Sequence, residues 1–157
     1  MSSRQLDMIS EYDWRESYSV GNVIIDQQHK KILMLCAESA KCLESTGPEG
    51  CEKFHDLLHE MAICTREHFA KEEALLLARN YPMLVEHVEE HERFQVAVAN
   101  FLFSATQGEL DRIGVFHFLS EWWVHHILVS DLDCRSYLVE RCALPQYSTT
   151  SDCLGAS

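Results

Sequence analysis

The chain has 157 residues, of which 46% are hydrophobic and 24% charged, and its formal net charge at pH 7 is −12. This length and composition are typical of a single globular domain with a sizeable core. The negative charge and the lack of a basic run argue against a nucleic-acid partner and against an anionic membrane surface. The chain contains no apolar stretch of the roughly 20 residues that span a bilayer, and its first residues lack the apolar core of a signal peptide, so we expect a cytoplasmic protein.

The chain is expected to begin with an irregular arm over about residues 1–20. Three aromatic side chains of this arm are available to pack on the body of the domain: Tyr12, Trp14 and Tyr18. A first helix is predicted over about residues 24–44, because His29 and the apolar side chains after it recur with a helical period. The Gly-Pro-Glu-Gly sequence at residues 47–50 predicts the break that follows.

Three further helices follow the first. They are predicted over about residues 51–79, 82–106 and 110–141, separated by Asn-Tyr-Pro at residues 80–82 and by Gln-Gly at residues 107–108. Short connections between four helices predict an all-α fold, an antiparallel up-down four-helix bundle with an N-terminal arm. The domain is expected to span residues 1–141, and the Ser/Thr-rich segment at 142–157 to be a disordered tail.

Five histidines and two carboxylates fall at spacings that place them on the inner faces of these helices. A single histidine on an apolar stripe is usually a hydrogen-bonded core residue, but two pairs here are four residues apart and share one helix face. Burying all these groups without partners would cost several kcal/mol each, and a metal centre would satisfy them together. Imidazole and carboxylate suit iron, zinc or manganese, and so many donors require two adjacent ions. The predicted metal ligands are His29, His68, Glu72, His87, His91, His126 and Asp131.

The spacing of His126 and Asp131 does not fit a regular helix. Five residues separate them, which places their side chains about 140° apart on an ideal helix. They can meet at one site only if Asp131 reaches across or if the helix contains a local π-type irregularity.

The remaining histidines and neighbouring carboxylates are assigned other roles. Glu73 points about 100° away from Glu72 around the helix and is not expected to bind the metal directly. Non-ligand positions are predicted for His55, His59, His117 and His125, and a solvated face for Glu89, Glu90 and Glu92.

Known motifs narrow the chemistry. The chain lacks the HExxH pattern of zinc proteases, and only residues 52–55 match the Glu-x-x-His unit that ferritin-like oxidases carry twice. A histidine-rich site with two carboxylates indicates iron that binds oxygen reversibly. The seven cysteines form no CxxC pair, and we expect reduced, partly buried thiols, with Cys142 and Cys153 near or in the tail.

The chain resembles the bacterial hemerythrin-like proteins over roughly residues 12–138. The resemblance is carried by IDQQHK at residues 25–30, HFAKEE at 68–73, and YP followed by HVEEH and Phe94 at 81–94. The last segment is WWVHHI at residues 122–127, followed by Asp131. The four segments together are highly specific, whereas each alone would be weak.

This resemblance implies a non-haem di-iron centre. One iron would be held by His87, His91 and His126, and the other by His29 and His68 with an open place for dioxygen. Glu72 and Asp131 would bridge the two irons together with an oxo or hydroxo group. The side chains expected to line the dioxygen pocket, in addition to packing in the core, are Phe69, Trp123 and Ile127.

Two features depart from the pattern of the family. Trp123 stands where members usually carry a leucine, so its indole is expected to narrow or seal the oxygen pocket. The cysteine-containing extension from about Cys142 has no counterpart that can be assigned. Both features bear on the physiological role and not on the metal site.

The expected function is reversible dioxygen binding, for carriage or storage, by a monomer that is not an enzyme. One alternative is an oxygen or redox sensor that acts through a protein partner, which the sequence does not identify. A second alternative is an enzyme that consumes peroxide or nitric oxide with the same irons. That enzyme would need a proton donor near the open iron.

Overall fold

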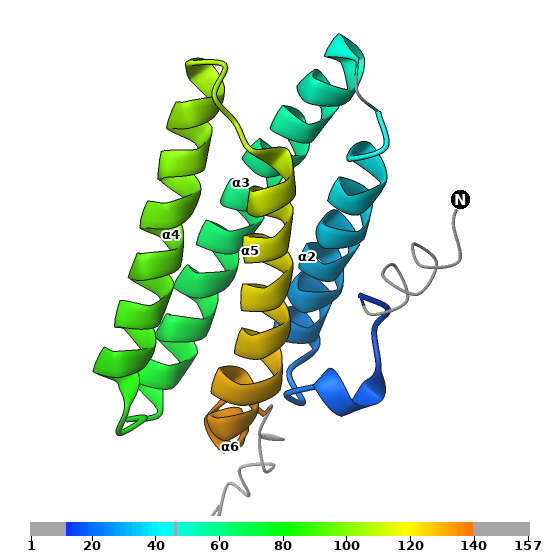
Figure 1. Cartoon of the computed structure of the whole chain (residues 1–157). Coiled ribbons are helices and arrows are strands. Elements are labelled where there is room, and N and C mark those ends of the chain that lie inside the picture. The colour runs from blue at the N-terminus through cyan, green and yellow to red at the C-terminus, as the bar shows by residue number, and fades with distance from the viewer. Residues whose placement is uncertain (1–11, 46, 140–157) are drawn as a thin grey trace, which may run out of the picture.

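The computed structural model describes residues 12–45 and 47–139, and four long helices form an antiparallel bundle (Figure 1). These are α2 (Val23–Cys42), α3 (Pro48–Ala78), α4 (Leu84–Thr106) and α5 (Arg112–His125). Helix α2 packs against α3 and α5, and α3 packs against α4. The predicted all-α four-helix bundle is confirmed, and the described part of the chain contains no β-strand. The predicted tail at residues 142–157 lies outside the described residues.

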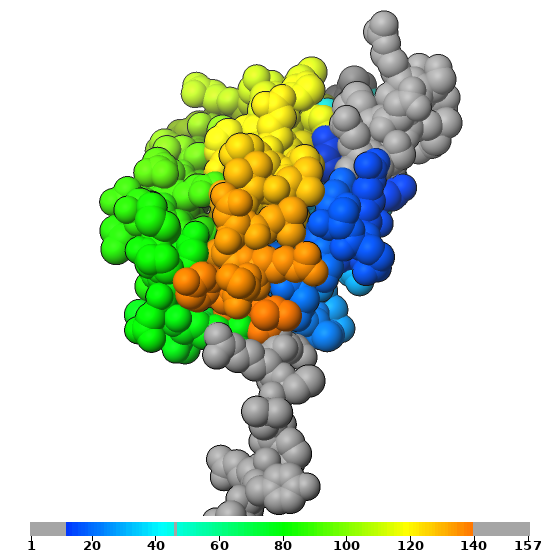
Figure 2. Space-filling view, turned by 90° about the horizontal axis from the view of Figure 1, so that it is seen from below, coloured from blue at the N-terminus to red at the C-terminus, as the bar shows by residue number. Residues whose placement is uncertain are grey.

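The fourth helix was predicted to run over about residues 110–141, but the structure divides this stretch into three elements. After α5 the chain forms a π-helix, η2 (His126–Asp131), and then a short helix, α6 (Arg135–Leu138). Because each π-helical turn contains more residues than an α-helical turn, the inward face of the chain changes at His126. Figure 2 looks at this end of the bundle and shows its orange C-terminal part lying across the end, between α4 and the blue N-terminal segment.

Local interactions explain where α2 begins and where α3 ends. The side-chain oxygen of Asn22 accepts hydrogen bonds from the backbone N–H groups of Ile24 and Ile25, at 3.1 and 3.2 Å, and so caps the N-terminus of α2. The same side chain donates to the carbonyl oxygen of Leu138 at 3.1 Å, which ties α2 to the end of α6. Helix α3 ends before Asn80, whose φ of 55° is a left-handed conformation that asparagine tolerates.

Apolar side chains form two separate clusters along the bundle. The larger one fills most of the interior and includes Phe54, Leu58 and Phe116. The smaller one, Val20, Ile25, Leu76, Cys134 and Leu138, closes the end where α2 begins and α3 ends. Along α2, His29 lies between Ile25 of the smaller cluster and Ile32 of the larger one. Along α3, Glu72 lies between Phe69 of the larger cluster and Leu76 of the smaller one. Apolar packing therefore borders the predicted ligands toward both ends of the bundle.

The N-terminal arm packs on the bundle, as expected for its described part. A short 3-10 helix, η1 (Glu16–Tyr18), precedes α2, and Tyr18 is buried. The ring of Tyr12 meets Phe116 edge-on, with 6.1 Å between ring centroids. None of the helices in the described ranges is both long and apolar enough to cross a membrane.

Candidate metal centre

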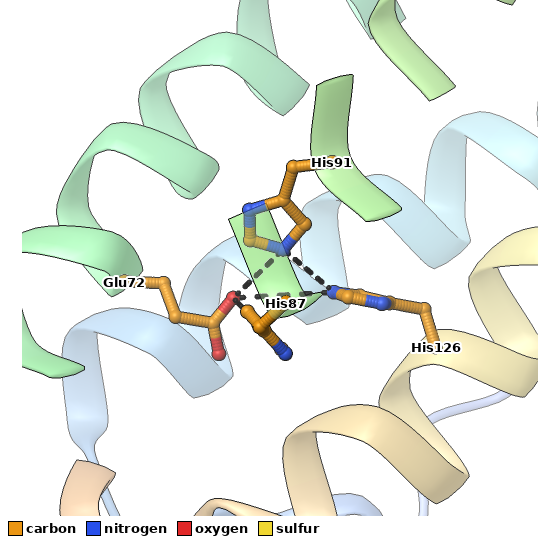
Figure 3. A group of neighbouring side chains, drawn as sticks. All are labelled: Glu72, His87, His91 and His126. Atoms are coloured by element: carbon orange, nitrogen blue, oxygen red, sulfur yellow. Dashed lines mark hydrogen bonds and ion pairs between the residues drawn. The ribbon is translucent and has the colours of Figure 1, made fainter. Parts of the chain in front are cut away.

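The seven predicted ligands meet in one buried layer of the bundle. His29 comes from α2, and α3 and α4 contribute two residues each. The pair from η2, which follows α5 directly, completes the set, so the ligands come from α2, α3, α4 and η2. Six of the seven side chains have no solvent exposure, and His87 is 5% exposed. Figure 3 shows the side chains of Glu72, His87, His91 and His126 converging from three segments of the bundle.

The Glu72 carboxylate lies at the centre of this layer. Its Oε2 atom is 3.4 Å from Nε2 of His87 and 3.5 Å from Nε2 of His91 (Figure 3). The same oxygen is 3.5 Å from Nε2 of His68 and 4.0 Å from Nε2 of His126. Glu72 therefore faces the imidazoles of both predicted groups, which is the position of a bridging carboxylate.

The Asp131 carboxylate, like that of Glu72, faces histidines of both predicted groups. Its Oδ2 atom is 3.0 Å from Nε2 of His29, and its Oδ1 atom is 3.1 Å from Nε2 of His126. The Oδ1 atom is also 3.8 Å from Nε2 of His87. The two carboxylates thus lie between the same two sets of histidines.

The π-helix explains how two residues five apart reach one site. Its hydrogen bonds join residues five apart, so His126 and Asp131 are about one turn apart on the same face. Of the two alternatives that the sequence left open, the structure shows the π-type irregularity. In a regular α-helix, Asp131 would point well away from His126.

The outer nitrogen of three histidines faces an oxygen acceptor. His91 donates its Nδ1–H to Glu73 at 2.7 Å, and His126 donates its Nδ1–H to Glu90 at 3.0 Å. Nδ1 of His68 lies 3.3 Å from the side-chain oxygen of Gln28. In His68 and His91 these contacts fix the tautomer and direct the Nε2 lone pair inward, as is usual for metal-binding histidines.

The imidazole nitrogens and carboxylate oxygens that point into the site would be better satisfied by a cation than by their contacts with one another. The Nε2 atoms of His91 and His126 are only 3.0 Å apart, and those of His29 and His68 are 3.3 Å apart. Among the described residues, Glu72 Oε1 and both side-chain oxygens of Asp131 are buried with no hydrogen bond of acceptable geometry. Buried acceptors converging in this way are stabilised by positive charge placed between them.

Burial and neighbouring charges set the protonation of the histidines. Burial, reinforced by His29, lowers the pKa of His68 to about 3, and burial with His126 lowers the pKa of His91 to about 2. Burial also acts to lower the pKa of His126, but the Asp131 carboxylate and its hydrogen bond raise it well above the ordinary range. Two imidazoles are therefore neutral donors, and His126 carries the proton that a bound cation would displace.

The carboxylates remain ionised despite their burial. Burial and the charge of Asp131 act to raise the pKa of Glu72, but hydrogen bonds from His126 and His87 lower it to about 2. Burial likewise acts to raise the pKa of Asp131, and the charge of His126 with its hydrogen bond brings it well below the ordinary range. Two anionic carboxylates among imidazoles form a donor set suited to divalent or trivalent ions.

Aromatic rings wall the site on the side of the main core. Phe69 stacks on the His91 ring, with 3.6 Å between centroids and 2° between planes. Trp122 stacks on His126 at 4.4 Å, and the ring centroid of Trp123 lies 5.5 Å from that of His68. Ile127, the third residue expected in the pocket, is also buried. The site therefore faces apolar surface, not water, on this side.

The prediction that Glu90 belongs to a solvated face is wrong. Its carboxylate accepts from His126 and also from the Ser130 hydroxyl, whose oxygen lies 2.9 Å from Glu90 Oε2. Sequence reasoning also missed Gln28 and Ser130. One signal was available, because Glu90 follows His87 by three residues and so lies near the inward face of α4. The carboxylates that are exposed as expected are Glu89 and Glu92.

The other histidines lie outside the ligand layer. His55 is half-buried, and the exposed ones are His59, His117 and His125. Solvent approaches the layer at a surface hollow of about 370 Å³, whose lining includes His87, Glu90 and Ser130. Glu90 therefore stands between the buried His126 and the solvent.

The Glu90 contact predicts an effect on metal affinity. We expect Glu90→Ala to lower the affinity for a divalent ion by about 10- to 100-fold, because His126 loses its acceptor and η2 loses its tie to α4. Glu90→Gln should retain most of the affinity, since the amide oxygen can still accept from Nδ1. Competition with a chromogenic chelator measures both changes.

The matched controls are Glu89→Ala and Glu92→Ala, which remove exposed carboxylates from the same helix. Both should leave the affinity unchanged. An affinity of Glu90→Ala equal to that of the unchanged chain would show that the contact with His126 does not support the site.

Comparison with known proteins places this site in a family. The family model described as Hemerythrin HHE cation binding domain matches residues 20–133. A bacteriohemerythrin of Stenotrophomonas maltophilia is 28% identical over 123 residues, which cover 75% of each chain. Myohemerythrin-1 of Phascolopsis gouldii is 26% identical over 132 residues, covering 84% of this chain and 98% of that protein.

A solved structure supports the fold alone. The crystal structure of a leucine-to-phenylalanine mutant superposes with a TM-score of 0.73 and 19% sequence identity, over 82% of this chain and 97% of that one. The segment matched by the family model contains all seven of the clustered donors and both helical pairs. The chain therefore belongs to the hemerythrin family.

Proposed function

We propose that this chain binds dioxygen reversibly at a non-haem di-iron centre in the middle of its bundle. The observation that supports this most directly is the position of the two carboxylates. Glu72 and Asp131 each lie between histidines of both sets, at 3.0 to 4.0 Å. Imidazole with carboxylate suits iron, and two irons would supply the electrons that dioxygen accepts on binding.

The proposed ligands divide unequally between the two metal positions. Glu72 and Asp131 would be shared. Three histidines would hold one ion, namely His87, His91 and His126, and two would hold the other, namely His29 and His68. The position with two histidines therefore has room for an added small ligand.

The surroundings of the two-histidine position favour binding over turnover. His68 has the neutral amide of Gln28 behind it, and the Trp123 ring lies beside it. The outer carboxylates Glu73 and Glu90 stand instead behind His91 and His126, in the three-histidine set. Neutral, apolar surroundings exclude water and deliver no proton to the bound ligand, as reversible binding requires.

The aromatic wall has a second role beside packing. Phe69 and Trp123 are fully buried and border the ligand rings, and Trp123 fills space beside the open position. Their bulk would keep water from the centre and would favour a small, uncharged ligand. We propose dioxygen as that ligand, with carriage or storage as the use of the binding.

The function is tested by the spectrum of the reduced, iron-loaded protein. Exposure to air should produce a ligand-to-iron charge-transfer band, and removal of oxygen should abolish it, over repeated cycles. A band that never appears, or immediate and permanent oxidation of the irons, would contradict reversible binding. Steady consumption of peroxide or nitric oxide by the same sample would favour an enzyme instead.

The ligand assignment predicts iron content. Glu72→Ala or Asp131→Ala should reduce the bound iron from two ions toward one or none, because each carboxylate would hold both ions. His55→Ala and His117→Ala are the controls, since both histidines lie outside the ligand layer. Elemental analysis of the purified variants measures the result. Loss of iron from His55→Ala would refute the assignment.

Trp123 predicts a change in ligand kinetics. Trp123→Leu should open space beside His68, so dioxygen should leave faster and the irons should oxidise irreversibly faster, each severalfold. The cavity should also lower the free energy of unfolding by about 2–4 kcal/mol. Stopped-flow release of oxygen and thermal unfolding measure the two effects.

Trp122→Leu provides the matched control. It removes an indole that stacks on His126, on the three-histidine side. Its effect on oxygen release should be much smaller than that of Trp123→Leu. Equal effects of the two substitutions would show that Trp123 has no special position at the open site.

A further inference from the structure

A cysteine thiol lies against the ligand layer and is not used by the proposed iron centre. Cys134 is free and has no solvent exposure. Its Sγ atom and one donor atom each of Glu72, His87 and Asp131 all lie within 4.8 Å of one another. Four donors from three segments thus surround one point at the edge of the centre.

The backbone explains this placement. Cys134 lies at the turn between η2 and α6, three residues after Asp131. Its thiol donates to the backbone carbonyl oxygen of Asp131 at 3.4 Å. The π-helix that turns the Asp131 side chain inward therefore also places the thiol on the inner side of the chain.

The carboxylate oxygens next to the thiol point to a ligand. Both side-chain oxygens of Asp131 and one of Glu72 are fully buried, and among the described residues none of the three accepts a hydrogen bond of good geometry. The imidazoles nearest to the oxygens of Asp131 are those of His29 and His126, at 3.0 and 3.1 Å. Around a tetrahedral zinc ion, with bonds of about 2.0–2.3 Å, donor atoms lie less than about 4 Å apart. The four donors, all within 4.8 Å of one another, would need to move closer by less than about 1 Å to reach that spacing.

Chemistry distinguishes this group from the iron ligands. Thiolate is a soft donor that suits zinc and cobalt, whereas the remaining ligands of the layer are imidazoles and carboxylates. A thiol that coordinates a divalent ion is deprotonated by that ion.

We propose that Glu72, His87, Asp131 and Cys134 form a second cation site, which overlaps the iron centre and takes thiophilic divalent ions such as zinc. When the ion binds, a sulfur–metal bond forms, the S–H bond breaks and the proton leaves to solvent; no electrons are transferred. The site shares both bridging carboxylates with the proposed iron centre. Zinc bound there therefore prevents assembly of the iron pair, and this consequence rests on the proposed function.

The test uses cobalt(II), a spectroscopic substitute for zinc, added below one equivalent to the metal-free full-length chain. The unchanged chain should show a thiolate-to-cobalt charge-transfer band in the near ultraviolet. Cys134→Ser should lose this band. Cys36→Ser is the matched control, because Cys36 is equally buried but belongs to the main core. It should keep the band.

Zinc affinity gives a second measurement. Loss of an outer hydrogen-bond partner of a ligand commonly costs 10- to 100-fold in metal affinity, so loss of a direct donor should cost at least about tenfold. Cys134→Ser should show this loss in competition with a chelator, while its iron content after loading should equal that of the unchanged chain. Equal zinc affinities of the two chains would overturn the proposal.

Two further results would also overturn it. One is cobalt bound by the unchanged chain with only imidazole and carboxylate bands, and the other is a thiolate band that persists in Cys134→Ser. If Cys134→Ser does not fold, cadmium NMR of the unchanged chain decides, because a shift for nitrogen and oxygen ligands alone would refute the sulfur ligand. The two proposals can fail separately. If neither cobalt nor cadmium shows a sulfur ligand but the iron-loaded protein shows its oxygen-dependent band, only the zinc site is refuted. If cobalt is bound by sulfur but the iron-loaded protein shows no such band, only the proposed function is refuted.

Discussion

Two ionised carboxylates without solvent exposure require compensating positive charge, and this requirement organises the whole centre. Glu72 and Asp131 receive it from the surrounding imidazole nitrogens, and in the absence of a cation from the proton on His126. A single α-helix cannot place enough donors around two such groups, because only residues three or four apart share a face. The donors therefore come from four different elements, α2, α3, α4 and η2, and the two apolar clusters hold these elements in place.

The π-helix is the second constraint. Helices α3 and α4 each provide a pair of donors four residues apart, which regular geometry brings to one face. His126 and Asp131 are five apart and need the wider turn of η2. The same turn places Ser130 against Glu90 and Cys134 against the carboxylates. A regular helix there would separate Asp131 from His126 and lose both outer contacts.

The sequence predicts the helical pairs and the bundle because both depend on spacing within one helix. The pairs His68/Glu72 and His87/His91 can be recognised because their members are four residues apart. The five-residue spacing of His126 and Asp131 shows only that the helix must be irregular or that Asp131 must reach across. The roles of Glu90 and Cys134 were not predicted, because they depend on how one helix is placed against another. Gln28 is a similar case, since its contact with His68 joins α2 to α3. Helical periodicity gives no information about such contacts.

The groups behind the histidines make the two halves of the centre unequal. A carboxylate behind an imidazole strengthens its Nε2 donor, and a neutral amide does so less. Glu73 and Glu90 therefore make His91 and His126 the stronger donors, while His68 is supported only by Gln28. In the proposed iron centre, the three-histidine position would therefore have both more ligands and more basic ones. The other position would be electron-poorer and less filled, and His68, one of its two histidines, lies beside Trp123, so an added ligand would bind there.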